Sequence, residues 1–178
     1  MVSSAVASAA LRDWSPPDPG QSALREAFLG FLAARPDDAC RRSCVPGHLT
    51  ASALLLDHTG RYVLLTLHPR VGRWIQLGGH SEPADQTLRD TALRETVEES
   101  GIEGLELDPD PLHLDVHPIT CSLGVPTRHF DVRYLARAPA GAVATISDES
   151  DDLRWWPVDD LPTNCDTIPQ LVRLASLR

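Results

Sequence analysis

The chain has 178 residues, of which 42% are hydrophobic, and this length and composition are typical of one globular domain with a sizeable core. Its net charge of −9 excludes a general nucleic-acid binder, whose affinity depends on a basic surface. All 16 basic residues are arginine, which excludes a Walker-type phosphate loop, a Schiff-base lysine and a lysine general base.

The N-terminal part, residues 1–45, is predicted to be an extension ahead of the main domain, residues 46–178. Its first residues are small and apolar but lack a basic segment, so we expect a flexible tail and not a signal peptide. A proline-rich linker follows over residues 14–20. Apolar spacing then predicts a helix over Ser22–Ala34, whose amphipathic face would offer a surface for a homodimer.

Two apolar runs, Thr50–Leu56 and Arg61–Leu67, flank the turn sequence Asp57-His58-Thr59-Gly60 and predict a β-hairpin. A short segment, Trp74–Leu77, then leads into a glycine pair at Gly78 and Gly79. No apolar run along the chain approaches the roughly 18 residues that a membrane span needs, so no membrane partner is expected.

A helix is predicted from about Gln86 to Ser100, where neither glycine nor proline occurs and apolar residues recur at helical spacing. Asp85 is expected to cap its N-terminus, although its carboxylate could instead brace the preceding loop. Gly101 is expected to end the helix in the left-handed conformation, with Ile102 folding back over the last turn.

The rest of the chain predicts further strands and one more helix. Strands before and after one central helix indicate an α/β fold in which a mixed sheet is sandwiched between helices. The expected elements are strands near Leu112–Ile119, His129–Arg137 and Leu153–Pro157, and a final helix over Thr167–Leu177.

The four cysteines (Cys40, Cys44, Cys121 and Cys165) lack the paired spacing of a zinc site and are expected to be buried, reduced thiols. Reduced thiols favour a cytoplasmic location. His113 and His117 lie four residues apart in a predicted strand. That spacing places them about 13 Å apart along the chain, too far to share one ion, so no zinc site is expected there.

Three acidic residues of the predicted helix, Glu95, Glu98 and Glu99, lie on one face because helical neighbours are three and four residues apart. Like charges at this spacing weaken an isolated helix by about 0.2–0.5 kcal/mol per pair, which favours a cation between them. Hard oxygen ligands indicate Mg²⁺ or Mn²⁺, and Mg²⁺ often completes its shell with water and substrate phosphates. The pattern indicates metal-assisted attack on a phosphate chain. The alternative is a solvated acidic face.

The stretch from Gly78 to Ile102 resembles the Nudix box, Gly-x5-Glu-x7-Arg-Glu-U-x-Glu-Glu-x-Gly-U, in which U is aliphatic. Arg94–Ile102 matches the second half, except that Thr96 replaces an aliphatic residue. In the first half Asp85 takes the place of the glutamate, with one extra residue before Arg94. The resemblance implies a Nudix-like α/β/α sandwich with a central mixed sheet, here with an N-terminal helical extension.

The resemblance also implies roles for individual residues. Glu95, Glu98 and Glu99 would be ligands for one to three divalent ions, and the backbone carbonyl of Gly78 would add another oxygen. Arg94 would pair with the helix carboxylates and hold them in place, which a planar guanidinium does better than an ammonium group. The metal would polarise the phosphate and acidify a bound water.

The resemblance implies a general base that is either a glutamate of the box or a glutamate on a later loop. On that loop Glu149 is the first choice, and Asp148 and Asp152 are the alternatives. This loop precedes a segment, Leu153–Pro162, that resembles the Trp-x-Pro-U-Asp-x-Leu tail of Nudix proteins.

Three further residues are expected to bind substrate. His80 would lie beside the pyrophosphate, and His129 and Asp131 share one face of a strand that could line the cleft. A purely structural role is the alternative for each histidine.

The predicted function is a divalent-metal-dependent pyrophosphohydrolase of the Nudix type. It would cleave a diphosphate bond in a nucleoside diphosphate linked to another moiety, or in a nucleoside triphosphate, by attack of water on phosphorus. The expected partner is a small-molecule nucleotide derivative, with neither nucleic acid nor membrane involved. The alternative is a Nudix-fold sensor or regulatory module that binds a nucleotide without hydrolysing it.

Overall fold

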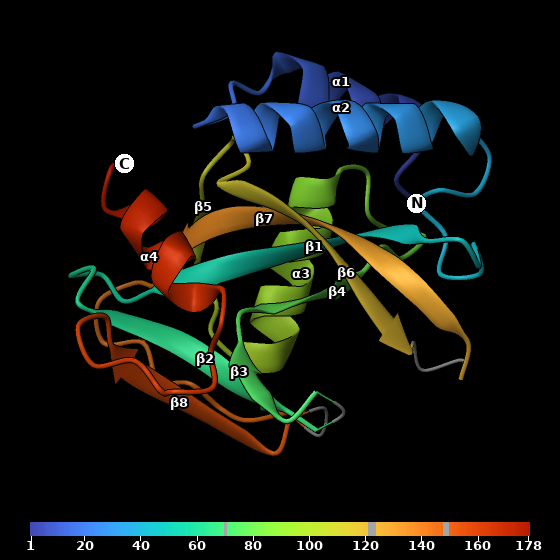
Figure 1. Ribbon diagram of the computed structural model, residues 1–178. Helices are drawn as coiled ribbons and strands as arrows, with labels where there is room; N and C mark the ends of the chain where they lie inside the picture. Colours follow the sequence, from blue (N-terminus) through green and yellow to red (C-terminus); the bar gives the residue numbers. More distant parts are fainter. Residues whose placement is uncertain (70, 121–123, 148–149) are drawn as a thin grey trace.

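A mixed β-sheet forms the centre of the molecule, and helices pack against it (Figure 1). The computed structural model describes residues 1–69, 71–120, 124–147 and 150–178. The helices are α1 (Ser4–Asp13), α2 (Pro19–Ala34), α3 (Leu88–Ser100) and α4 (Ile168–Ala175). The strands are β1 (His48–Leu56), β2 (Tyr62–His68), β3 (Arg73–Ile75), β4 (Leu77–His80), β5 (Glu106–Leu107), β6 (His113–Thr120), β7 (Pro126–Arg137) and β8 (Asp152–Pro157).

Strands β1 and β7 are the parallel pair at the middle of the sheet, in register from His48 opposite His129 to Leu56 opposite Arg137. On its other side β1 pairs antiparallel with β4 and then with β2. The β1–β2 pairing confirms the predicted hairpin. Strands β6 and β5 pair with β7, whereas β3 and β8 pair with β2.

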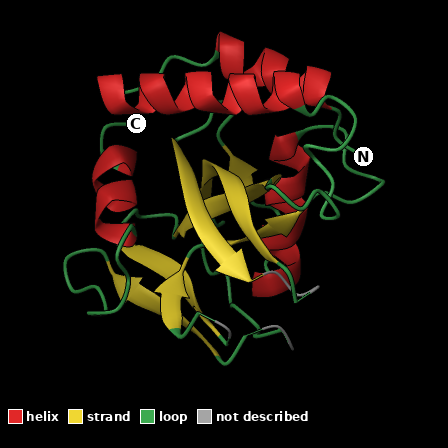
Figure 2. Ribbon diagram, turned by 45° about the vertical axis from the view of Figure 1, so that its right-hand side comes forward, coloured by secondary structure: helices red, strands yellow, loops and turns green. Residues whose placement is uncertain are grey.

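Alternation along β1 divides the core between the two faces of the sheet, because successive side chains point to opposite sides. Leu49, Ala51 and Leu55 join a cluster with residues of α1, α2 and α3. Leu54 and Leu56 point the other way and join a second cluster with α4. Figure 2 shows the strands between α3 and α4. The expected sandwich with a mixed sheet is therefore confirmed.

The second face changes character along β1. Near its N-terminal end the residues on the face of Leu54 are His48, Thr50 and Ser52 instead of leucines. In register beside them, β7 contributes a matching polar row, His129, Asp131 and Arg133. The sheet therefore collects polar side chains from distant parts of the sequence on one half of one face.

The predicted flexible tail at the N-terminus is wrong, because α1 is a helix built into the core. The Ser3 side chain caps it by accepting a hydrogen bond from the Val6 amide. Val2, Ala7 and Leu11 are buried in the same cluster as α2 and α3. Few apolar residues are needed to anchor this helix because α2 and the sheet already offer a surface to pack on.

Helix α2 confirms the predicted helix and is fixed to the sheet in two ways. Phe31 stacks on Phe130 of β7 with ring centroids 4.2 Å apart and an interplanar angle of 7°. The Gln21 amide pairs with β6, donating to the Leu114 carbonyl at 3.0 Å and accepting from the Leu114 N–H at 2.7 Å. The apolar face of α2 is thus used inside the chain, and the homodimer expected on it remains a prediction.

Other elements agree with the sequence except in detail. Strands β6, β7 and β8 and helix α4 lie where strands and a helix were predicted, whereas the two-residue β5 was not. Cys40, Cys44 and Cys165 are free and buried as expected, and Cys121 lies outside the described residues. None of the helices in the described ranges combines the length and apolarity needed to cross a bilayer.

Candidate active site

Helix α3, which carries the predicted acidic face, is capped at both ends. Thr87 and Asp90 form a reciprocal capping box at its N-terminus, so the prediction of Asp85 as the N-cap is wrong. The Thr87 hydroxyl accepts a hydrogen bond from the Asp90 amide, the third of the helix. This amide therefore needs no partner from Asp85. Gly101 ends the helix with φ 67°, which confirms the predicted left-handed C-cap.

Asp85 instead braces the loop before α3, which was the alternative role. Its side chain is 4% exposed, and its carboxylate accepts from the Glu82 amide at 2.8 Å and the Thr91 hydroxyl at 3.0 Å. Arg94 donates to both of its oxygens, from Nε at 3.1 Å and from Nη2 at 3.0 Å. This bidentate pair ties the loop to the helix two turns further along.

Arg94 also contacts the other groups of the predicted box. Its Nη2 lies 3.1 Å from a Glu95 oxygen, and its Nη1 lies 2.9 Å from a Glu98 oxygen. The same Nη2 donates to the backbone carbonyl of His80 at 2.8 Å. One guanidinium therefore connects three carboxylates to the end of β4, as its place in the box implies.

Glycines in β4 let the acidic residues of α3 approach the strand. The Gly78 amide donates to a Glu99 oxygen at 3.2 Å. A Cβ at Gly79 would lie only 2.6 Å from the Glu95 carboxyl carbon, so a larger residue there would push this carboxylate aside. Glu95 is 14% exposed, whereas Glu98, at the outer edge, is 57% exposed. The expected same-face placement of the three glutamates is therefore present.

The charges at this site shift the pKa values of the bracing pair. Burial alone would raise the pKa of Asp85, but hydrogen bonds from Arg94, the Glu82 amide and Thr91 hold it below its usual range. Burial opposes the charge of Arg94 as well, yet its bond to Asp85 and the negative charges of Glu95 and Glu98 raise its pKa. Both groups are therefore charged at neutral pH.

The donor set fits a hard divalent cation. Glu95, Glu98 and Glu99 project from one face of α3, Glu99 accepts from the Gly78 amide, and Arg94 pairs with both Glu95 and Glu98. Oxygen-only ligands of this kind suit Mg²⁺ or Mn²⁺. Holding such a cation would relieve the like-charge repulsion along α3.

The polar face of β1 and β7 is organised around Asp131. One of its carboxylate oxygens accepts from the Thr50 hydroxyl at 3.0 Å. The other accepts from Ser52 at 2.8 Å, from the Gln76 amide at 3.2 Å and from Arg133 Nε at 3.0 Å. Asp131 itself is buried, so it orients its neighbours.

Two of these neighbours have polar atoms that the described residues leave unsatisfied. The buried atoms Gln76 Oε1 and Arg133 Nη1 have no hydrogen-bond partner. The amide of Gln76 donates to Ser52 and Asp131, which fixes its oxygen on the opposite side. An acceptor and a cationic donor are thus presented together on this face.

His80 and His129, both predicted near the substrate, lie close together on the same face, and His48 joins them. Burial, and then the proximity of His129 and His48, lowers the pKa of His80 to about 3. Burial and the neighbouring His48 and His117 lower the pKa of His129 to about 4. These imidazoles are therefore neutral at pH 7 and can act as hydrogen-bonding groups or ligands.

A family profile described as the NUDIX domain matches residues 46–174, which is most of the chain. The chain belongs to the Nudix family. The predicted Nudix-type hydrolase is thereby confirmed at the level of the family. A search of curated proteins found no match.

Solved Nudix structures share the fold. A NUDIX family hydrolase from Clostridium perfringens superposes with a TM-score of 0.58 and 22% identity, covering 73% of this chain and 97% of that one. A C. elegans Ap4A hydrolase gives 0.55 and 23%, covering 72% and 95%. The NUDIX domain of Shewanella oneidensis NrtR, complexed with ADP ribose, gives 0.52 and 24%, covering 83% and 96%. At these identities the likeness is one of fold.

Glu149 and Asp148, two of the three candidates for the general base on the later loop, lie outside the described residues. Asp152, the other alternative, begins β8, and its carboxylate pairs with Arg154 at 2.5 Å.

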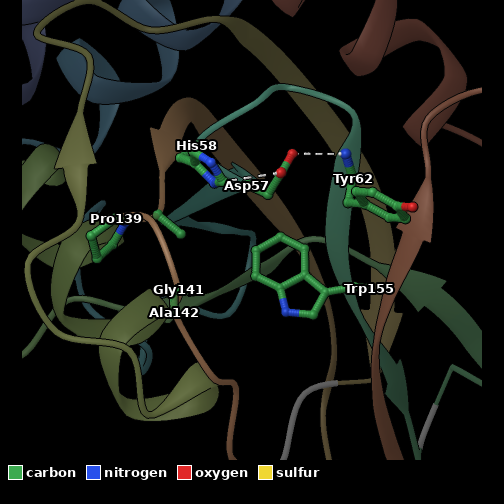
Figure 3. Close-up of a pocket in the computed structure, with 8 residues that line it drawn as sticks. Asp57, His58, Tyr62, Pro139, Gly141, Ala142 and Trp155 are labelled. Carbon is green, nitrogen blue, oxygen red and sulfur yellow. Dashed lines mark hydrogen bonds and ion pairs between the residues drawn. The ribbon is translucent and has the colours of Figure 1, made fainter.

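A separate depression of about 330 Å³ lies at the far end of β1 (Figure 3). Trp155 and Pro139 form part of its apolar wall, and Asp57 lies at its edge. The Asp57 carboxylate accepts hydrogen bonds from the Thr59, Arg61 and Tyr62 amides, so it serves the hairpin turn.

Three residues of the polar face were not predicted to belong to the site: His48, Gln76 and Arg133. Period-two alternation in β7 could have identified Arg133 as a partner of His129 and Asp131, since it is the next residue on their face. His48 carries no local signal because its pairing with β7 brings it to this face, and Gln76 is the single residue between β3 and β4.

Proposed function

We propose that this Nudix protein is a pyrophosphohydrolase that requires Mg²⁺ or Mn²⁺. The observation that carries the proposal is the grouping of Glu95, Glu98 and Glu99 on one face of α3, with Arg94 joining that face to β4. A domain that only bound nucleotide would not need this set of oxygen ligands. Glu95, Glu98, Glu99 and the Gly78 carbonyl would hold the cation, which supplies charge neutralisation at the phosphates and a more acidic bound water.

The residues of the chain have distinct tasks in this proposal. Arg94 and Asp85 keep the loop and the helix in fixed relation, so the carboxylates are oriented before substrate arrives. A loop acid, for which Glu149 remains the choice, would accept the proton of the attacking water. The water oxygen bonds to phosphorus while the bridging P–O bond breaks, and the leaving phosphate departs with its oxygen.

A nucleoside diphosphate linked to another group is the proposed substrate class, with nucleoside triphosphates as the alternative. The polar face of β1 and β7 would bind the rest of the molecule. His80 and His129 would contact the substrate there, and Asp131 would act by orienting Gln76 and Arg133. Among the structures with this fold are an Ap4A hydrolase and a domain complexed with ADP ribose, whose ligands carry phosphoanhydride bonds.

The test is hydrolysis of a panel of compounds (ADP-ribose, diadenosine polyphosphates and nucleoside triphosphates) with Mg²⁺, followed by chromatography of the products. Wild type should cleave at least one compound, and Glu98→Gln should lower turnover by orders of magnitude. Glu103→Gln, a matched change at an exposed residue beyond the end of α3, should leave turnover unchanged. If wild type and Glu98→Gln are equally inert while wild type still binds a nucleotide, the sensor module is the better description.

A further inference from the structure

Three histidines converge on the polar face of the sheet, opposite to α3. His48 lies beside His129 in the parallel β1–β7 register. His80 is opposite Thr50 in the β1–β4 pair, and Thr50 is two residues from His48, so all three share a face. Gly79, the residue before His80, points to the other side, against Glu95. Strand β4 therefore separates these imidazoles from the carboxylates of α3.

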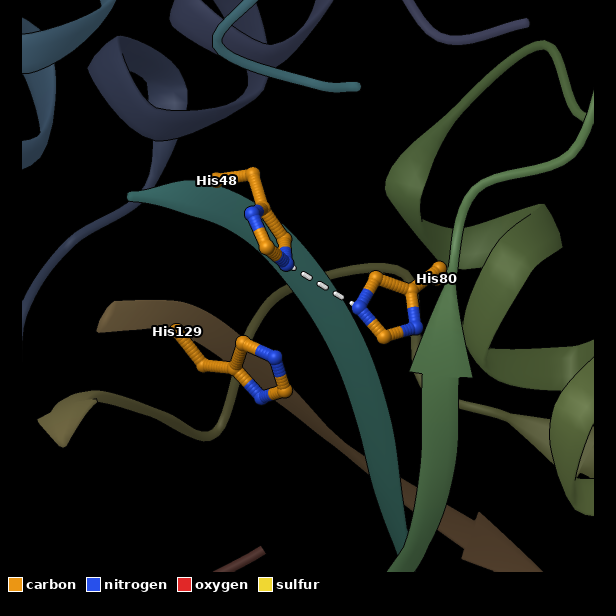
Figure 4. Close-up of side chains that lie close together, drawn as sticks. All are labelled: His48, His80 and His129. Atoms are coloured by element: carbon orange, nitrogen blue, oxygen red, sulfur yellow. Dashed lines mark hydrogen bonds between the residues drawn. The ribbon is translucent and has the colours of Figure 1, made fainter. Parts of the chain in front are cut away.

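The three imidazoles form a nearly equilateral triangle (Figure 4). The ring centroids are 5.0 Å apart for each of the pairs His48–His80, His48–His129 and His80–His129. Each ring offers one nitrogen such that all three lie within 4.8 Å of one another. The closest contact, between Nε2 of His48 and Nε2 of His80, is 3.0 Å.

These distances match those around one tetrahedral ion. With Zn–N bonds of about 2.0–2.1 Å, ligand nitrogens lie about 3.3 Å apart, and the centres of the attached rings about 5.2 Å apart. The observed triangle therefore needs small side-chain rotations and no movement of the strands.

Hydrogen bonding leaves ring nitrogens directed at the centre of the triangle. Nδ1 of His48 lies 3.3 Å from the Cys44 carbonyl, which can only accept, so Nδ1 carries the proton and Nε2 has the lone pair. Metal-bound histidines commonly donate their other N–H to a carbonyl in this way. Nε2 of His129 is buried and has no hydrogen-bond partner among the described residues.

We propose that His48, His80 and His129 bind one Zn²⁺ ion, in a site distinct from the oxygen-ligand site on α3. Imidazole ligands favour zinc over magnesium, and carboxylates favour the reverse, so the two sites would select different metals. On binding, the ring proton of His80 would lie on Nδ1, so that the ring stays neutral. Its Nε2 would then bind the ion in place of its present contact with Nε2 of His48. The ion would cross-link β1, β4 and β7 and would occupy ring nitrogens of His80 and His129, so in the zinc-bound protein these two residues would not contact the substrate directly. Zinc binding itself does not depend on the hydrolytic activity proposed above.

The experiment is titration of chelator-treated protein with Zn²⁺ alone, in competition with a chromophoric chelator. Wild type should bind one Zn²⁺ per chain and melt at a higher temperature when it is bound. His129→Gln should weaken binding by on the order of a hundredfold or more, since the loss of an outer-shell partner alone costs roughly 10–100-fold. His58→Gln, at an exposed histidine of the β1–β2 turn, is the matched control and should bind like wild type. Glu98→Gln should also bind like wild type, which separates this site from the one proposed on α3.

Zinc-edge X-ray absorption on the wild-type complex gives a second measurement that needs no variant to fold. It should show nitrogen neighbours at about 2.0 Å and no sulfur at about 2.3 Å. Sulfur in the shell would assign the ion to the buried cysteines, Cys40 and Cys44, and overturn the proposal. Failure of wild type to bind one equivalent, or unchanged binding by a folded His129→Gln protein, would overturn it as well.

Discussion

The pair formed by Asp85 and Arg94 should stabilise the fold, and the change Asp85→Asn tests this directly. In the native protein the carboxylate accepts four hydrogen bonds, two of them from Arg94. Asparagine has nearly the same shape but no charge, and one of its side-chain positions is a donor. The most favourable orientation keeps oxygen at the Oδ2 position, where it still accepts from Glu82, Thr91 and Arg94 Nη2. The amide group then faces Arg94 Nε, so one bond is lost.

The expected cost follows from these contacts. A hydrogen bond to a charged group contributes about 1.5–3 kcal/mol, and the remaining bond to Arg94 loses about half its strength when the charge is removed. Together these terms lower the free energy of unfolding by about 3 kcal/mol. This lies at the lower end of the roughly 3–5 kcal/mol for a broken buried pair, because Arg94 keeps Glu95 and Glu98 as partners.

Urea unfolding of metal-free protein measures this loss. Asp159→Asn, the same change at an exposed position, should alter the free energy of unfolding by no more than about 0.5 kcal/mol. A cycle with Arg94→Gln should give a coupling energy of about 2 kcal/mol between the two residues. If Asp85→Asn costs no more than the control, the pair is no stronger than an exposed ion pair and the bracing role is refuted.

Four further predictions follow from the same contacts. Folding lowers the pKa of Asp85, so the stability that its carboxylate contributes is complete above the unfolded pKa of about 3.9 and is lost as pH falls through the folded pKa. The difference in the free energy of unfolding between wild type and Asp85→Asn, measured by urea unfolding, should therefore narrow below about pH 4. Glu99→Gln should lower turnover by orders of magnitude yet leave the metal-free melting temperature unchanged, because the amide oxygen can still accept from β4; a marked fall in that temperature would make the glutamate structural. Gly79→Ala should push the Glu95 carboxylate aside and reduce metal-dependent turnover, and unaltered kinetics would contradict the close approach. Leu11→Ala should cost about 2–4 kcal/mol in urea unfolding, whereas a cost within error would mean that α1 is not part of the core.

Local signals in the sequence were sufficient for the box helix and the hairpin. The end of α3 at Gly101 was predictable because a left-handed C-cap favours glycine. The hairpin was predictable because Asp57 and Gly60 form a turn between two apolar runs. The same-face placement of the glutamates follows from helical geometry alone. Each of these features depends on residues within a few positions of one another, which is why they could be predicted.

The predictions for the N-terminus and for Asp85 were wrong because contacts with distant parts of the chain determine the structure there. Helix α1 has little apolar surface of its own, and burial of Leu11 depends on neighbours from α2 and the sheet. Asp85 lies at a position that favours capping, but its carboxylate binds Arg94 instead. The N-terminus of α3 is capped by the box of Thr87 and Asp90. That box was visible as a threonine followed three residues later by an acid, although aspartate is a less usual partner than glutamate.

The grouping of the three histidines depends on strand register, so it could not be predicted from the sequence, although His80 and His129 were each expected near the substrate. The same register fixes where the cluster lies relative to the site on α3. His80 ends a strand of only four residues, in which Gly79 faces Glu95 and His80 faces the other histidines. Its carbonyl accepts from Arg94, while its ring meets His48. Twisting β4 enough to separate the imidazoles would also withdraw Gly79 from Glu95 and break pairing with β1, each lost hydrogen bond costing about 1 kcal/mol. An ion held by the histidines would therefore resist the motions that disorganise the glutamates, although no ligand is shared between the two sites.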